Sequence, residues 1–118
     1  MSEEKLLQMF LIMCYYEPYQ TMAIAVPKRI EAKELMQRLA ALNESVPTWV
    51  RPTLRYKNTT ELEFDNGSSI SILHSQLQGC GRSLSWVALS QRLENLREWL
   101  ECVSPCVAGD QNRVIYFS

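Results

Sequence analysis

One continuous stretch, residues 59–91, constrains the fold of this chain more than any other part of it. Its first half alternates polar and apolar residues over 60–64 and again over 69–73, the pattern of two strands that each bury one face. Asn66-Gly67 stands between them, and Asn-Gly most readily supplies the two positive φ angles of a two-residue turn. The sequence therefore predicts a β-hairpin turning at Asn66-Gly67, with two apolar side chains of its first strand on one side, Leu62 and Phe64.

The second half of this stretch predicts a buried strand. A polar loop that contains glycine, residues 75–83, leads into a compact apolar run at residues 84–89. An apolar run bounded by loop signals is typical of a strand that is covered on both faces, as in a parallel sheet. Residues 21–26, which end at Pro27, have the same character, and residues 113–117 form a last apolar strand.

Three segments have the apolar spacing of helices: residues 3–16, 28–43 and 92–103. Ser2 is a suitable N-cap for the first, whose apolar stripe comprises Leu6, Leu7, Phe10, Leu11 and Cys14, widened by Met9, Ile12 and Met13. The inner face predicted for the second helix comprises Ile30, Leu35, Leu39 and Leu42. The crossing that follows it is expected to be anchored by Trp49, Val50 and Leu54.

The order helix, strand, helix, hairpin, strand, helix, strand indicates an α/β fold. We expect a mostly parallel sheet flanked by helices, with the β-hairpin inserted. At 118 residues the chain is expected to form one domain over residues 1–118, which is long enough to bury a core.

The composition of the chain limits which cellular compartment and which classes of binding partner can be expected. The net charge of −1 excludes a general attraction to nucleic acid or to anionic lipid, so any DNA contact must be local. A local patch could be built from basic residues that are interspersed with acids: Lys28, Arg29, Lys33, Arg38, Arg51, Arg55 and Lys57. Four cysteines do not have the density of a secreted disulfide scaffold, which favours a reduced, cytoplasmic setting. The apolar segment at residues 6–16 is too short to cross a bilayer, and no membrane contact is expected.

Chemically active groups are few. Cys80 with His74 could make a nucleophile and a base, and His74, Cys80, Cys102 and Cys106 could in principle bind zinc, although the chain contains no CxxC pair. Gly79-Cys80-Gly81 is a weak candidate for a phosphate nest because no lysine follows at the required spacing. These alternatives stay open, and the sequence predicts no catalytic residue, metal or cofactor.

From Tyr16 to Ser118 the chain resembles the ATPase domain of the large subunit of phage DNA-packaging terminases. The matching features are the strand at residues 21–25, the Pro- and Trp-containing turn at 46–52, the Asn-to-Ser pattern at 58–68, and Cys80-Gly81-Arg82-Ser83 leading into residues 84–89. The helix with Trp99, the Pro105 turn and a last strand ending at Ser118 follow in the same order. The resemblance implies an incomplete P-loop NTPase fold of phage or prophage origin.

The departures from this family argue against catalysis. The family's Walker A loop lies before the first matching helix, and this chain begins after it. Ser90-Gln91 stands where the family has the Asp-Glu pair that ends Walker B, and Cys80 stands in place of a loop arginine. A hydroxyl and an amide neither hold Mg²⁺ well nor serve as a base. We therefore expect a pseudo-ATPase rather than an enzyme.

The resemblance also predicts an exposed edge, because the family's first strand would pair with the strand at residues 113–117. Without that neighbour the strand is open to a second copy or to a terminase subunit. The N-terminal helix could instead shield it. The leading hypothesis is a terminase-like binding protein. The alternatives are a non-functional remnant of a packaging ATPase gene and an unrelated small α/β enzyme that uses Cys80 and His74.

Overall fold

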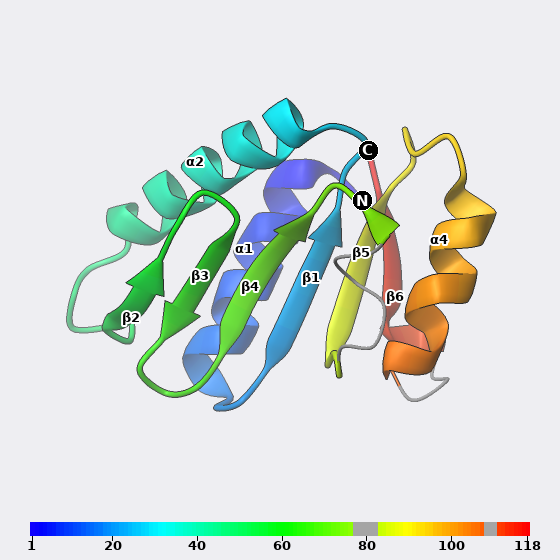
Figure 1. Ribbon diagram of the computed structural model, residues 1–118. Coiled ribbons are helices and arrows are strands. Elements are labelled where there is room, and N and C mark those ends of the chain that lie inside the picture. Colours follow the sequence, from blue (N-terminus) through cyan, green and yellow to red (C-terminus); the bar gives the residue numbers. More distant parts are fainter. Residues whose placement is uncertain (77–82, 108–110) are drawn as a thin grey trace.

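A computed structural model describes residues 1–76, 83–107 and 111–118 of the chain (Figure 1). The helices are α1 (Glu3–Tyr16), α2 (Arg29–Ser45) and α4 (Leu96–Val103), with short 3₁₀ turns at Ser104–Val107 and Gln111–Arg113. The strands are β1 (Thr21–Ala25), β2 (Leu54–Lys57), β3 (Glu61–Phe64), β4 (Ser69–Leu73), β5 (Trp86–Ser90) and β6 (Val114–Phe117).

Within the described residues, the strands form one six-stranded sheet in the order β2-β3-β4-β1-β5-β6. β1 lies between β4 and β5 and runs parallel to both, and β6 runs parallel to β5. β3 pairs antiparallel with β2 and with β4. This arrangement confirms the predicted α/β architecture, in which helices flank a mostly parallel sheet that carries a hairpin.

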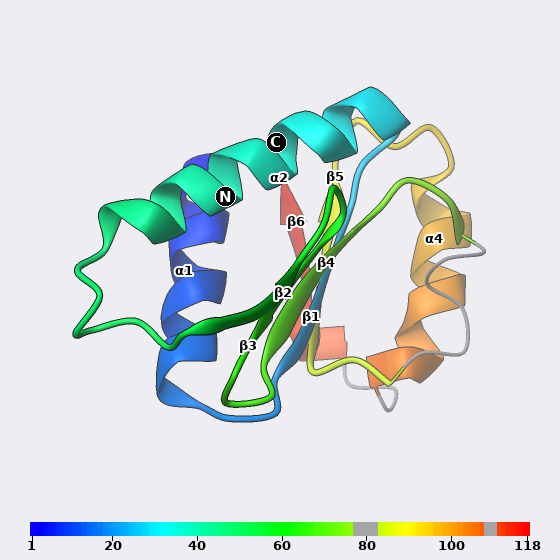
Figure 2. The same ribbon diagram turned by 60° about the vertical axis from the view of Figure 1, so that its left-hand side comes forward.

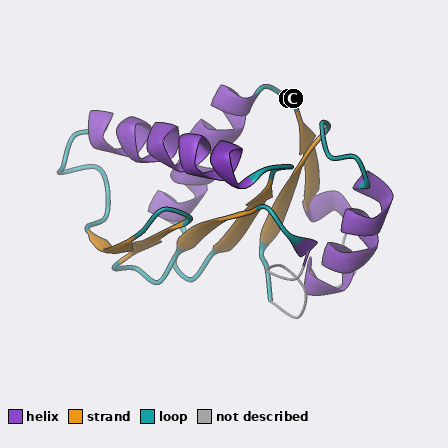
Figure 3. Cartoon of the chain, turned by 45° about the horizontal axis from the view of Figure 1, so that its top comes forward, coloured by secondary structure: helices purple, strands orange, loops and turns teal. Residues whose placement is uncertain are grey.

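The helices divide between the two faces of the sheet, as Figure 2 shows. α1 and α2 cover one face, where Phe10 and Leu39 pack with Met22 and Ile24 of β1. α4 covers part of the other face, where Trp99 and Val103 pack with the alternate residues of β1 and β5. Figure 3 shows the same layers from above, with the sheet between the helices. Strands β1 and β5 are thus buried on both faces, as their continuous apolar runs predict.

Helix α1 has the predicted bounds and the predicted N-cap. The Ser2 hydroxyl accepts a hydrogen bond from the Lys5 N–H at 3.3 Å. The buried residues of the helix are the predicted stripe, Leu6, Leu7, Phe10, Leu11 and Cys14. The side opposite to the sheet stays open, because Ile12 is 53% exposed.

The hairpin of β3 and β4 forms as predicted, but its turn does not. The Phe64 N–H donates to the Ser68 carbonyl, and the Gly67 N–H donates to the Phe64 carbonyl, so residues 65–67 form a three-residue loop. Gly67 has φ +88°, and Asn66 has a negative φ. This is a type I turn closed by a glycine in the left-handed region. The predicted two-residue Asn66-Gly67 turn was therefore wrong.

The Asn66 side chain explains why the longer loop is stable. Its Nδ2 donates to the Cys14 carbonyl at 2.7 Å, and its Oδ1 accepts from the Ser68 N–H at 3.0 Å. The asparagine thereby joins the end of α1 to the hairpin. Leu62 and Phe64 do face the same side, as predicted, and both lie in the core under α1 and α2.

Three residues that were predicted to lie against the core are exposed. Ile30 is 64% exposed, because it lies off the inner face of α2, which comprises Ala32, Leu35, Met36, Leu39, Ala40 and Asn43. Trp49 is 86% exposed and Val50 is also exposed, so only Leu54 of the three anchors packs against the core. Helix α4 is also shorter than predicted, because the chain turns after β5 and the Leu93 N–H donates to the Ser90 carbonyl.

Candidate functional site at the carboxyl end of the sheet

The parallel strands β1, β5 and β6 end at the same edge of the sheet, where α1 and α2 begin (Figure 1). Both ends of the chain lie at this edge. The Ser118 N–H donates to the Met1 carbonyl at 3.1 Å, so the residues that precede α1 lie beside the end of β6. In open α/β sheets this edge carries the ligand sites.

Ser90 and Gln91, the pair at the end of β5, both make hydrogen bonds that shape the turn after the strand. Ser90 is fully buried, and its hydroxyl accepts a hydrogen bond from the Arg92 N–H at 3.2 Å. The Gln91 N–H donates to the Phe117 carbonyl at 2.8 Å, and the Gln91 side chain is exposed. Neither the Ser90 hydroxyl nor the Gln91 amide is a carboxylate. Neither group can therefore hold Mg²⁺ well or act as a base toward a water molecule.

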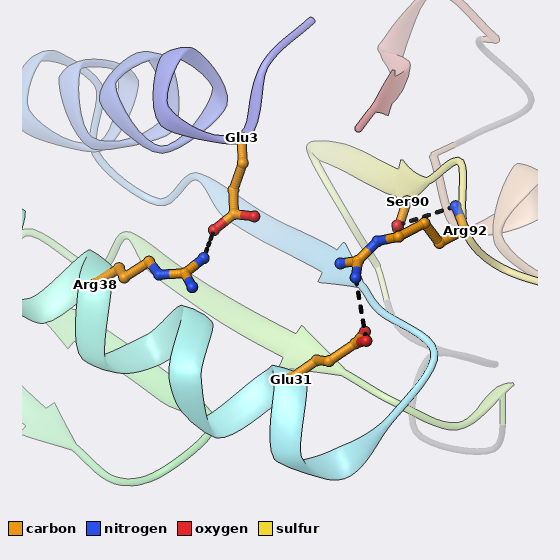
Figure 4. Close-up of polar contacts among 5 residues, drawn as sticks. All are labelled: Glu3, Glu31, Arg38, Ser90 and Arg92. Atoms are coloured by element: carbon orange, nitrogen blue, oxygen red, sulfur yellow. Dashed lines mark hydrogen bonds and ion pairs between the residues drawn. The ribbon is translucent and has the colours of Figure 1, made fainter.

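Two ion pairs occupy the space between these strand ends and α2 (Figure 4). The Arg92 guanidinium contacts Glu31 Oε1 at 3.1 Å, and the Arg38 guanidinium contacts Glu3. The four side chains border a cavity of about 220 Å³. Each cation faces an acid, so the pairs join α1 and the residues after β5 to α2.

His74 directly follows β4 and lies at a second, larger cavity at this edge. The cavity has a volume of about 600 Å³, and its lining comprises Pro27, Lys28, His74, Ser75, Gln76, Leu93, Glu94, Asn95 and Trp99. These residues follow β1, β4 and β5 or belong to α4. In the enzyme hypothesis His74 is the base and Cys80 is the nucleophile. Cys80 and the rest of the loop at residues 79–82 lie outside the described residues.

The zinc hypothesis gains nothing from the described part of the chain, where no group of three or more His, Cys, Asp or Glu side chains could hold a metal ion. Cys106 lies in the 3₁₀ turn after α4, and its Sγ contacts the Cys102 carbonyl at 3.7 Å. In the same described ranges, no helix has both the length and the apolar character needed to span a membrane.

The basic residues proposed for a DNA patch are partly engaged within the protein. Arg38 pairs with Glu3, Arg51 donates to the Asn43 carbonyl at 2.8 Å, and Arg55 donates to the Asp65 carbonyl at 3.0 Å. The guanidinium groups therefore help to fix the loop after α2 and the hairpin.

A buried polar group near α1 was not predicted from the sequence. The Tyr15 hydroxyl donates to Asn43 Oδ1 at 2.5 Å, and Asn43 is 1% exposed. Burial raises the pKa of the Tyr15 phenol, and the Arg51 guanidinium partly offsets this rise. Burial also raises the pKa of the neighbouring Cys14 thiol from 9.0 to about 12, so this thiol stays protonated and unreactive at neutral pH. Nothing in the sequence indicated the bond between Tyr15 and Asn43, because Asn43 is a single polar residue on a helix face that also carries alanines.

No model of a known protein family matches the chain, and no curated protein matches it as a relative.

Proposed function

We propose that this chain is a terminase-ATPase-like domain that binds another protein through the open edge of β6 and does not hydrolyse ATP. Two features support the proposal. β6 is the last strand of the sheet and pairs with β5, so its other side is the one where the resemblance would put the family's first strand. The N-terminus of α1 meets the ends of β5 and β6, where the family's phosphate loop would lead into its first helix.

The backbone of β6 offers hydrogen bonds to a neighbour. The Phe117 carbonyl accepts from Gln91, and in a parallel pair alternate residues direct both backbone groups to one side. Ile115 and Phe117 therefore bond to β5, while the N–H and carbonyl groups of Val114 and Tyr116 face away from the sheet. Among the described residues, no strand pairs with this side of β6, and Met1 meets it only just beyond the strand, where its carbonyl accepts from the Ser118 N–H.

The opposite edge of the sheet is protected in a way that β6 is not. β2 carries Arg55 and Lys57, and its pairing with β3 is irregular between Leu54 and Tyr56. Charged side chains and bulges are the usual means of preventing a second chain from pairing with an edge strand. β6 has the sequence VIYF, without a charged residue. The contrast favours β6 as the edge that accepts a partner strand.

The occupant that we propose is an extended segment of a terminase subunit. The family's first strand would lie beside β6, so a related chain can supply a segment of matching character. Ser90 and Gln91 provide no carboxylate for Mg²⁺ or for the attacking water, so the role of the domain is binding alone. Such a protein would act in the cytoplasm of the phage's host.

Co-purification with a terminase large subunit tests this function, and one substitution isolates the edge. Tyr116→Pro removes the outward N–H and keeps the bonds of Ile115 and Phe117 to β5, because proline is tolerated on the free side of an edge strand. We expect Tyr116→Pro to abolish co-purification and the matched control Tyr116→Phe, which keeps the N–H, to retain it. Equal recovery of both variants, or no recovery of the wild-type protein, would contradict the proposal.

A further inference from the structure

The open edge of β6 sets the register of any strand that pairs with it. Within β6, the N–H and carbonyl groups of Val114 and Tyr116 face away from β5. The next outward donor, the Ser118 N–H, already bonds to the Met1 carbonyl at 3.1 Å. A partner strand therefore bonds to Val114 and Tyr116, and its residue between these bonds is in register with Ile115 in either strand direction.

The side chain of that partner residue has a defined direction. Residues in register on neighbouring strands point to the same face of a sheet. Ile115 packs against the core cluster under α1 and α2, whereas Val114 packs against the cluster under α4. The partner residue in register with Ile115 therefore points to the face that α1 covers.

Four half-buried apolar side chains lie on this face, and we call them the α1 shelf: Met9 and Met13 of α1, Trp86 of β5 and Ile115 of β6. On α1, Leu7 lines the groove toward α2, and Met9 and Met13 flank the buried stripe on the opposite side. α2 packs over β4, which lies on the other side of β1 from β5 and β6. The two methionines therefore face the end of the sheet at which β6 is the edge strand.

The α1 shelf suits a large apolar side chain. Its four side chains pack against the buried core but are only partly covered. The Arg113 guanidinium lies over the Trp86 ring, 5.5 Å from its centroid, and helps to hold the ring in place. Met9 and Met13 are flexible and can adjust to the shape of the group that they contact.

We propose that the β6 edge selects a partner strand with a large apolar residue in register with Ile115, and that this residue packs on the α1 shelf. The two flanking residues of the partner point to the other face, beside Val114 and Tyr116, and can be polar because Tyr116 is 37% exposed. This inference rests on the binding function proposed above and adds the side-chain chemistry of the partner. Backbone bonds give affinity for a strand, and the shelf gives specificity.

Methionine-methyl NMR of the full chain tests the α1 shelf, with the terminase large subunit as the probe. We expect the Met9 and Met13 signals to shift when the complex forms. The signal of Met36, which lies on α2 at the groove toward Lys57, should stay unchanged. A complex that forms without a shift of Met9 and Met13 would overturn this inference and leave binding through the edge intact.

Two other outcomes of this NMR experiment would also overturn the inference. The same shifts on concentrating the chain alone would show that a second copy, rather than the terminase, occupies the shelf. The absence of any complex would contradict the proposed function itself, and the inference would fall with it.

Two substitutions separate the α1 shelf from the backbone of β6. Met13→Gln removes an apolar contact and keeps every bond of β6, so it should weaken terminase binding by roughly tenfold. Leu42→Gln is the matched control, because Leu42 is half-buried against the same core cluster but lines the groove between α1 and α2. It should leave the affinity unchanged, and urea unfolding checks that both variants are folded. Wild-type affinity in Met13→Gln together with loss of binding in Tyr116→Pro would support the edge and overturn the shelf.

Discussion

The ring of Tyr19 lies against the Cα of Gly67, so close that a Cβ at position 67 would stand 2.5 Å from Tyr19 Cδ1. Both residues have positive φ angles, +61° for Tyr19 and +88° for Gly67. The chain after α1 and the tip of the hairpin thus fit together through two residues in the left-handed region.

Replacing Gly67 by alanine should lower the free energy of unfolding by about 1–2 kcal/mol, because the new Cβ opposes the positive φ and meets the tyrosine ring. Urea unfolding measures this change. Tyr19 is exposed, so the additional substitution Tyr19→Ser should recover the part of the loss that is due to the ring and leave the part due to φ. An unchanged unfolding midpoint for Gly67→Ala would show that the loop differs from the one described.

The hydrogen bond between Tyr15 and the buried Asn43 should contribute measurably to stability. Asn43 is buried, and its Nδ2 has no partner among the described residues, so Tyr15 is the one side chain that satisfies this amide. Tyr15→Phe should cost about 1–2 kcal/mol of stability, since it leaves the whole amide buried without a bond. Asn43→Leu in the Tyr15→Phe background should restore part of that loss. A double variant less stable than Tyr15→Phe alone would contradict this interpretation.

Stability should fall above pH 9 because of Cys14. Burial raises the folded-state pKa to about 12 from 9.0, so between these values the unfolded chain releases the thiol proton and the folded chain keeps it. The free energy of unfolding therefore falls as pH rises, by up to about 1.4 kcal/mol per pH unit for this group. Below pH 9 the thiol is protonated in both states, and the contribution of Cys14 to stability is fully present. Cys14→Ala should reduce the slope of stability against pH between 9 and 11. A slope identical to that of the wild-type protein would exclude Cys14 as its source.

Purified protein with Mg²⁺ and ATP should release phosphate only at the background rate. Ser90 is committed to the Arg92 N–H and Gln91 has no carboxylate, so the end of β5 lacks both groups that hydrolysis requires. A colorimetric phosphate assay measures this directly. Turnover that disappears in a Gln91→Ala variant would refute the proposal that the chain is a pseudo-ATPase.

The elements of this fold could be read from the sequence where periodicity was strong. The stripe of α1 and the continuous apolar runs of β1 and β5 each identify their own burial, because local spacing alone decides which faces are apolar. The predictions for Ile30 and Trp49 were wrong because local spacing alone did not decide whether these residues are buried. The buried face of α2 includes Ala32 and Ala40, which a search for large apolar residues overlooks, and the loop after α2 turns Trp49 outward.

The candidate site was harder to predict than the fold. The pair of Arg92 and Glu31 joins residues 61 positions apart, and neither residue belongs to a recognisable motif. The cavity beside His74 depends on which faces the helices after β1 and β5 cover. That choice is made by the packing of the whole sheet, so no single segment encodes it.

Amide hydrogen exchange at β6 tests the central claim most directly. In the chain alone, the Tyr116 N–H faces away from the sheet and should exchange much faster than the amides of Ile115 and Phe117, which bond to β5. Addition of a terminase large subunit should slow the exchange of Val114 and Tyr116 specifically, and Tyr116→Pro should abolish the protection at Val114. A Tyr116 amide that exchanges at the same rate with and without the terminase subunit, under conditions where the two proteins co-purify, would contradict binding through this edge.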